Sequence, residues 1–195
     1  MKNEKIEEII KDENILNLYT YGSVVYQTNN EKSDVDFIAI VIVKQEEQVI
    51  LDNINISFYT IEEFKEKLDS HEISAIECLF LPDDLILKKT VDFEFNLDKH
   101  KLHCECSKKA SNSFVKAKKK IKDGHIYIGQ KSLFHSIRII DFAIQIIKHG
   151  KINDYASQSQ ILKLILDENP NTVVDKFKAT YNLKKSELRR LEGRT

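Results

Sequence analysis

The spacing of hydrophobic residues changes character near residue 95. Before it, short apolar runs alternate with polar turns, and residues 54–59 place Ile and Phe at every second position, as half-buried strands do. This pattern predicts four strands, over residues 16–21, 35–43, 49–51 and 54–59. It predicts helices around them, over residues 3–13, 61–68 and 73–80. Thr60 and Glu63 form a capping box for the second helix, and Pro82 ends the third.

After residue 98 the apolar residues recur at helical spacing, and the chain contains one Pro and few Gly. Four helices are predicted, over about residues 99–122, 131–149, 157–167 and 172–192. The breaks between them are expected at Gly124, Gly129, Gly150 and Pro170. The chain is therefore predicted to be α+β: a small mixed β-sheet with flanking helices over residues 1–95, followed by an all-helical domain over residues 96–195.

The composition is that of a globular protein, with 42% hydrophobic and 31% charged residues and a net charge of −1. No apolar run approaches the ~20 residues of a membrane span, and the charged N-terminus does not resemble a signal peptide. We therefore expect a cytoplasmic protein without membrane contact. The net charge by itself favours neither nucleic acid nor membrane as a partner.

Candidate chemistry lies between the first two predicted strands. Gly22-Ser23 ends one apolar run, and Asp34 and Asp36 open the next. Side chains two residues apart on a strand share a face, so the two carboxylates repel unless a cation lies between them. A divalent metal ion bound by Asp34 and Asp36 would remove this repulsion. The Gly-Ser turn offers backbone N–H groups and a hydroxyl to a phosphate. We therefore predict that a metal ion and a phosphate group bind next to each other at these residues.

These residues resemble the defining motif of the DNA polymerase β-type nucleotidyltransferase superfamily, a Gly-Ser followed after about ten residues by Asp-x-Asp. Tyr26 and Ser33, and the later segments at residues 54–64, 75–82 and 131–138, resemble a minimal subgroup that carries a C-terminal helical domain. The resemblance implies a polymerase β-like palm over the first domain. It also implies transfer of a nucleoside monophosphate from an NTP to a hydroxyl acceptor, which is an RNA 3′ end, a protein or a small molecule.

The resemblance also implies roles for individual residues. Asp34 and Asp36 are the expected catalytic and metal-binding residues, holding two Mg²⁺ ions, with Mn²⁺ as a substitute. The expected nucleotide-binding residues are Gly22, Ser23, Ser33, Asn55, Lys131, His135 and Arg138. The last three fall at i, i+4 and i+7, which places them on one stripe of a helix. His135 fits a structural role as well as it fits a ligand.

One position departs from the family pattern. The third carboxylate is expected on the strand over residues 54–59, where the matching residue is Asn55. Asp52 replaces it only if the strand shifts register, and an odd shift would turn the apolar face outward. The loss of this charge motivates an alternative function, a catalytically weakened nucleotide- or RNA-binding module.

The densest positive run is Lys116, Lys118, Lys119, Lys120 and Lys122, preceded by Lys108 and Lys109. A solvated helix face explains such a run, and so does a contact surface for an RNA or DNA strand. No aromatic platform interleaves the lysines of residues 116–122, so stacking of single-stranded bases is not predicted. A helical interaction protein that docks an acidic partner is the third hypothesis for the whole chain.

Overall fold

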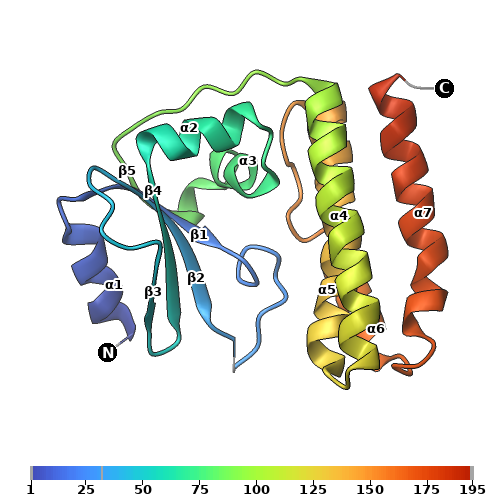
Figure 1. The fold of residues 1–195 in the computed structure, drawn as a ribbon. Helices are drawn as coiled ribbons and strands as arrows, with labels where there is room; N and C mark the ends of the chain where they lie inside the picture. Colours follow the sequence, from blue (N-terminus) through green and yellow to red (C-terminus); the bar gives the residue numbers. More distant parts are fainter. Residues whose placement is uncertain (1, 32, 194–195) are drawn as a thin grey trace. The chain divides into compact units, whose positions relative to one another are not determined.

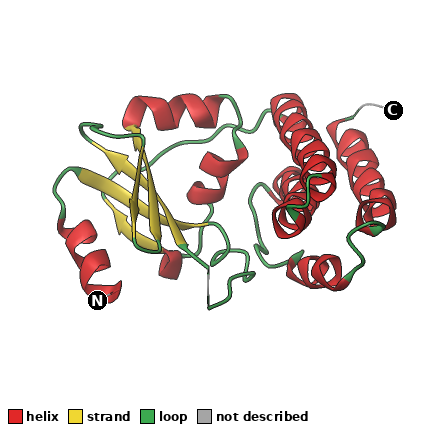
Figure 2. Ribbon diagram, turned by 60° about the horizontal axis from the view of Figure 1, so that its bottom comes forward, coloured by secondary structure: helices red, strands yellow, loops and turns green. Residues whose placement is uncertain are grey.

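The computed structural model describes residues 2–31 and 33–193. The chain folds into two compact units, one of residues 1–70 and 74–96 and the other of residues 71–73 and 97–195. The predicted α+β class is confirmed: one unit carries a sheet with flanking helices, and the described elements of the other are helices (Figure 2). Among the described residues, no helix has both the length and the hydropathy needed to cross a bilayer.

The first unit is built on a five-stranded mixed sheet with the order β3-β4-β2-β1-β5 (Figure 1). The strands are β1 Ile15–Tyr21, β2 Val35–Val41, β3 Gln48–Leu51, β4 Ile54–Thr60 and β5 Ile86–Lys89. β2 pairs with β1 antiparallel and with β4 parallel. The two strands β1 and β2 are the most deeply buried of the five, as expected for strands covered on both faces.

Helices cover both faces of this sheet. The helix α1 (Lys2–Lys11) packs Ile6, Ile9 and Ile10 on a core of strand residues that includes Leu18 and Phe37. On the opposite face lie α2 (Ile61–Asp69) and α3 (Ile73–Leu79), which is followed by a 3₁₀ turn (Asp83–Leu85). The predicted capping box of α2 is confirmed, because the Thr60 and Glu63 side chains each accept a hydrogen bond from the other's backbone N–H.

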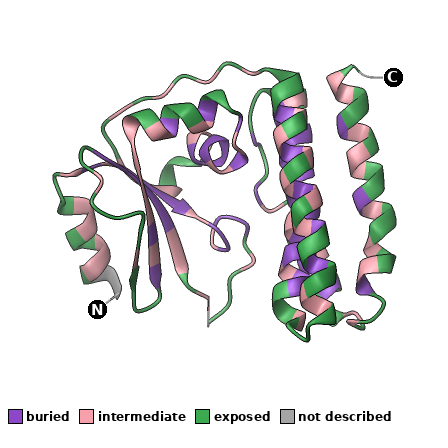
Figure 3. Ribbon diagram, viewed as in Figure 1, coloured by how far each residue is buried: buried purple, intermediate pink, exposed green. Residues whose placement is uncertain are grey.

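The second unit is a bundle of α4 (Lys99–Lys122), α5 (Ile126–His149), α6 (Ser159–Asp167) and α7 (Val173–Glu192). The helix α5 packs against the other three and is buried along most of its length (Figure 3). Its left-handed C-cap is Gly150, as the predicted break requires.

Two sequence-based expectations about elements are wrong, and one strand was not predicted. Gly129 does not break the chain between helices, because α5 begins at Ile126 and not at residue 131 as predicted. A Cβ at Gly129 would lie 2.5 Å from an Ile121 side-chain carbon and 3.0 Å from the Ala117 carbonyl oxygen, so the glycine allows α4 and α5 to approach closely. The second strand ends at Val41, where its pairing with β1 ends, and not at Val43. The strand β5 was not predicted, because its four residues include two lysines that give no alternating pattern.

Candidate active site

Asp36 lies at the centre of a row of residues that crosses three strands. The pairing of β1 with β2 places Tyr21 opposite Asp36, and the pairing of β2 with β4 places Asn55 on its other side. The neighbouring residue Phe37, like Ala39, belongs to the core on the sheet face covered by α1. Because successive side chains of a strand point to opposite faces, the Asp36 side chain lies on the face covered by α2 and α3. The end of β1 and the beginnings of β2 and β4 therefore meet at one carboxylate.

Gly22 follows β1 directly and packs against this carboxylate. Its φ is +74°, a conformation that residues with a Cβ rarely adopt. A Cβ at this position would overlap a carboxylate oxygen of Asp36 and would lie 3.2 Å from the carboxyl carbon. Both constraints demand glycine. The backbone of the Gly-Ser turn is thereby held in contact with the carboxylate that was predicted to bind metal.

The turn itself is closed by backbone hydrogen bonds. The Tyr26 N–H donates to the Gly22 carbonyl oxygen at 3.2 Å, and the Thr28 N–H donates to that of Ser23 at 2.9 Å. Ser23 is buried within the turn, at 9% exposure. Residues 22–27 form turns and not a regular helix, so the segment presents its backbone locally, without a helix dipole behind it.

Asp34 is exposed and immediately precedes β2, two residues from Asp36. The strand is anchored between them, because the Val35 N–H donates to the Asn53 carbonyl oxygen at 2.8 Å. Ser33 closes the preceding turn, since its hydroxyl accepts from the Asn30 N–H at 2.9 Å. The predicted residues of the first unit thus gather at one corner of the sheet.

The sheet register selects Asn55, and not Asp52, as the third residue of this corner. The Asn55 amide nitrogen donates to an Asp36 carboxylate oxygen at 3.0 Å. Asp52 lies in the turn between β3 and β4 and forms an ion pair with Lys5, which lowers the pKa of its carboxyl. Asp36 therefore has a neutral amide beside it where the family pattern expects a third carboxylate.

A buried acid–phenol contact ties the Gly-Ser turn to α3. The Tyr26 hydroxyl donates to a Glu77 carboxylate oxygen at 2.5 Å, and both side chains are at most 2% exposed. The Tyr26 ring also packs edge-to-face on Tyr21, with 6.2 Å between ring centroids. The sequence contained no signal for this contact, because its partners are 51 residues apart and no periodicity relates them.

The donor set of this corner can be compared with what a metal ion requires. Within residues 2–31 and 33–193, no group of three His, Cys, Asp or Glu side chains is arranged to hold a metal. Mg²⁺ is usually bound by one or two carboxylates together with water and substrate phosphates. Asp34 and Asp36 fit such an ion, completed by the substrate. They do not form a closed cage of protein ligands.

The basic residues of the predicted site lie in the second unit, on α5. The Arg138 Nε donates to the His135 Nδ1 at 3.4 Å, and the Lys131 ammonium lies 5.6 Å from the Tyr127 ring centroid. Arg138 is buried at 4% exposure, with its guanidinium 4.9 Å from the Phe142 ring centroid. Their grouping on one stripe of α5 follows from helical spacing, and their part in nucleotide binding stays a prediction.

His135 has an unusual protonation equilibrium. Burial, followed by the positive charges of Arg138, Lys131 and Lys116, lowers the pKa of His135 to about 3. The imidazole is therefore neutral at physiological pH, and its Nδ1 accepts the hydrogen bond from Arg138. A neutral His135 adds no positive charge to the stripe. It orients the arginine.

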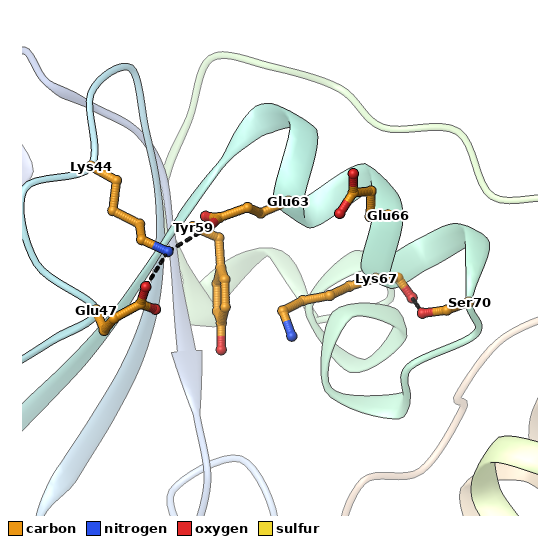
Figure 4. Close-up of a pocket in the computed structure, with 7 residues that line it drawn as sticks. All are labelled: Lys44, Glu47, Tyr59, Glu63, Glu66, Lys67 and Ser70. Carbon is orange, nitrogen blue, oxygen red and sulfur yellow. Dashed lines mark hydrogen bonds and ion pairs between the residues drawn. The ribbon is translucent and has the colours of Figure 1, made fainter.

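A separate pocket of about 490 Å³ opens between the far end of β4 and α2 (Figure 4). Its residues are Lys44, Glu47, Tyr59, Glu63, Glu66, Lys67 and Ser70. Lys44 contacts two of the glutamates, at 2.8 and 2.5 Å, and the Lys67 ammonium lies over the Tyr59 ring. The glutamates offset the positive charge here, so the pocket is a poor site for phosphate. Tyr59 is four residues along β4 from Asn55, about 13 Å away.

Comparison with known proteins identifies the family to which this chain belongs. The family model described as "Nucleotidyltransferase domain" matches residues 3–128, which include every predicted site residue of the first unit. The chain belongs to this nucleotidyltransferase domain family. No curated protein matches the chain significantly. A solved structure of a nucleotidyltransferase-like protein from Exiguobacterium sibiricum 255-15 is similar at 12% identity and a TM-score of 0.34, covering 98% of this chain and 73% of that one.

Proposed function

We propose that this chain is a nucleotidyltransferase that moves a nucleoside monophosphate from an NTP to a hydroxyl acceptor. Family membership supports nucleotidyl transfer in general. The observation that supports the proposal for this chain is the contact of the Gly22 turn with Asp36. A turn of this kind can offer backbone N–H groups to a phosphate, and the carboxylate beside it is suited to a metal ion.

The reaction joins the acceptor oxygen to the α-phosphorus and breaks the bond between that phosphorus and the bridging oxygen of the β-phosphate. The acceptor hydroxyl loses its proton, and pyrophosphate leaves with the electron pair of the broken bond. Because charge accumulates on the departing pyrophosphate, cations near it lower the barrier. The family resemblance implies this role for Lys131 and Arg138.

Asp34 and Asp36 would hold the magnesium ions, of which the family pattern implies two. Bound Mg²⁺ would supply charge neutralisation at the triphosphate and a lowered pKa for the acceptor hydroxyl. The Gly22 N–H and the Ser23 hydroxyl bind the β- and γ-phosphates. Asn55 holds Asp36 in place through its amide hydrogen bond, and it does not serve as a base because an amide does not accept the proton.

The position of the label after reaction tests this chemistry. The protein is incubated with Mg²⁺ and each NTP, labelled either at the α- or at the γ-phosphate, together with RNA, protein and small-molecule acceptors. Nucleotidyl transfer predicts that the α-label appears on the acceptor and the γ-label only in pyrophosphate. Transfer of the γ-label to the acceptor would identify phosphoryl transfer and would contradict the proposal.

A second function is favoured by one specific observation, the neutral Asn55 beside Asp36. A module that binds Mg-NTP without turnover needs the two carboxylates and the turn, but not the third carboxylate. Calorimetry that detects Mg-NTP binding, combined with no labelled product from any NTP and acceptor, would favour this function. The substitution Asn55→Asp then measures whether the missing charge is the cause.

A further inference from the structure

Charge is distributed very unevenly along this chain. Residues 97–195 contain 21 Lys and Arg against 10 Asp and Glu, a net charge of +11, although the whole chain carries −1. The preceding 96 residues are correspondingly acidic. A strongly basic helical unit of this size is the electrostatic footprint of a protein that binds a polyanion.

The positive charge is concentrated on the outer side of α4. The sequence from Lys108 to Lys122 contains no acidic residue. The exposed residues of this segment are lysines, apart from Asn112 and Val115. We call the exposed lysines the α4 lysine ridge: Lys108, Lys116, Lys118, Lys119 and Lys122. At 1.5 Å per residue, the ridge is about 21 Å long.

The ridge lysines differ in ion pairing from four lysines of the same unit, Lys109, Lys148, Lys176 and Lys184, each of which pairs with a carboxylate. Lys148 contacts Glu187, and Lys176 contacts Glu168, both at 2.6 Å. Within the described residues, the structure records no ion pair for any ridge lysine, whereas each of those two lysines has one. Five like charges along one helix repel one another, so binding of a polyanion that neutralises them is favourable.

Two stacked aromatic rings lie between a ridge lysine of α4 and a lysine of α7. Phe114 of α4 stacks on Tyr181 of α7, with 4.4 Å between ring centroids. The Lys118 ammonium lies 5.2 Å from the Phe114 ring centroid, and the Lys185 ammonium lies 5.5 Å from that of Tyr181. Lys185 also donates to the Ser111 hydroxyl at 3.3 Å. These contacts orient two ammonium groups on adjacent helices without neutralising either.

The burial of these two rings limits how the surface can recognise a ligand. Phe114 and Tyr181 are buried, at 9% and 6% exposure, and they stack on each other. They are not available as platforms for bases, so base stacking on these rings does not contribute to binding. A ligand recognised in this way is bound by its backbone phosphates.

We propose that the α4 lysine ridge, together with Lys185, binds the phosphodiester backbone of a nucleic acid independently of base sequence. Its length matches about six successive phosphates on one strand of a duplex. This inference names the class of acceptor for the transfer proposed above and rests on that function in this respect. The binding itself requires neither NTP nor catalysis, so it is measured separately.

Fluorescence anisotropy of the full chain with a labelled RNA duplex of about 20 base pairs tests the proposal, with a DNA duplex of the same sequence in parallel. We expect log Kd to change steeply with log salt, with a slope of about 5 in magnitude. Equal binding of both duplexes supports recognition of the shared backbone. Preference for RNA supports the proposal and narrows the ligand to RNA.

Two charge-matched variants locate the surface. Lys116→Gln with Lys119→Gln should weaken binding at least tenfold and reduce the salt slope by about 2. Lys163→Gln with Lys176→Gln removes the same charge from exposed positions on α6 and α7 and should leave binding unchanged. A second ridge pair, Lys108→Gln with Lys122→Gln, repeats the test, and thermal melts show that each variant is folded.

Three results would overturn the proposal: no binding at low salt, an equal loss in the α6/α7 control, or displacement of RNA by polyglutamate at equal charge concentration. The last result would identify an acidic protein as the partner. Nucleic-acid binding without nucleotidyl transfer would leave this proposal intact and contradict the proposed function. Transfer to a protein or small molecule without nucleic-acid binding would do the reverse.

Discussion

Replacing Gly22 with alanine tests whether the Gly-Ser turn positions Asp36. Two costs are expected. The left-handed conformation at φ +74° costs a residue with a Cβ about 1–2 kcal/mol. The overlap of the new Cβ with the Asp36 carboxylate requires one of them to move, for a further cost of about 1–3 kcal/mol. The second cost is the informative one, because the group that moves belongs to the site.

Gly150 provides a control with the same backbone conformation. Its φ is also +74°, but a Cβ there would meet nothing within 4 Å. Gly150→Ala should therefore lower the unfolding free energy by about 1–2 kcal/mol and leave nucleotide affinity unchanged. The contrast between the two variants isolates the overlap with Asp36 from the general cost of a Cβ in this conformation.

Calorimetry of thermal unfolding and titration with Mg-NTP give the two readouts. Gly22→Ala should be less stable than the Gly150→Ala control and should bind Mg-NTP at least about tenfold more weakly, which corresponds to about 1.4 kcal/mol. If Gly22→Ala binds Mg-NTP as tightly as the control variant, the turn does not position the site, and the reasoning from its contact with Asp36 is refuted.

Three further predictions concern individual side chains. Tyr26→Phe removes the hydrogen-bond donor to the buried Glu77 carboxylate, so it should lower the free energy of unfolding by about 1–3 kcal/mol and speed amide exchange in the turn at residues 22–28. The control Tyr19→Phe removes a buried hydroxyl from β1 and should leave that amide exchange unchanged. Folding lowers the pKa of His135 from 6.5 to about 3, so the folded chain resists protonation of this imidazole while the unfolded chain does not. Its contribution to stability is therefore complete above pH 6.5 and is lost as pH falls. Unfolding experiments should show about 2 kcal/mol less stability at pH 5 than at pH 8, and this loss should be absent in His135→Gln. Asn55→Asp should strengthen Mg²⁺-dependent NTP binding, and an unchanged calorimetric affinity would show that this position does not reach the metal.

Local sequence signals predicted the elements well where one principle dominated. The helix α4 has the predicted bounds, because a long amphipathic pattern runs from the Asp98 cap to Asp123 without interruption. Gly129 was misread because a glycine that permits close helix packing looks the same in sequence as one that ends a helix. The edge strand β5 carries too few apolar residues to be recognised before its partner β1 is known.

The site shows the same division between local and non-local information. Gly22, Asp34 and Asp36 were predictable, because spacing and strand alternation place them together. The family resemblance predicted Asn55 as the third position. Its pairing with Asp36 depends on the parallel register of β2 and β4, which the hydrophobic pattern only constrains. The contact of Tyr26 with Glu77 was out of reach, since it depends on how α3 packs against the turn.

The central claim is that Asp34 and Asp36 support nucleotidyl transfer. The most direct test compares release of α-labelled product by the wild-type chain and by the double variant Asp34→Ala with Asp36→Ala, with Asp83→Ala and Asp84→Ala as a control pair of exposed acids in the same unit. We expect transfer by the wild type and the control, and none by the site variant. Transfer that survives intact in the site variant would contradict the claim.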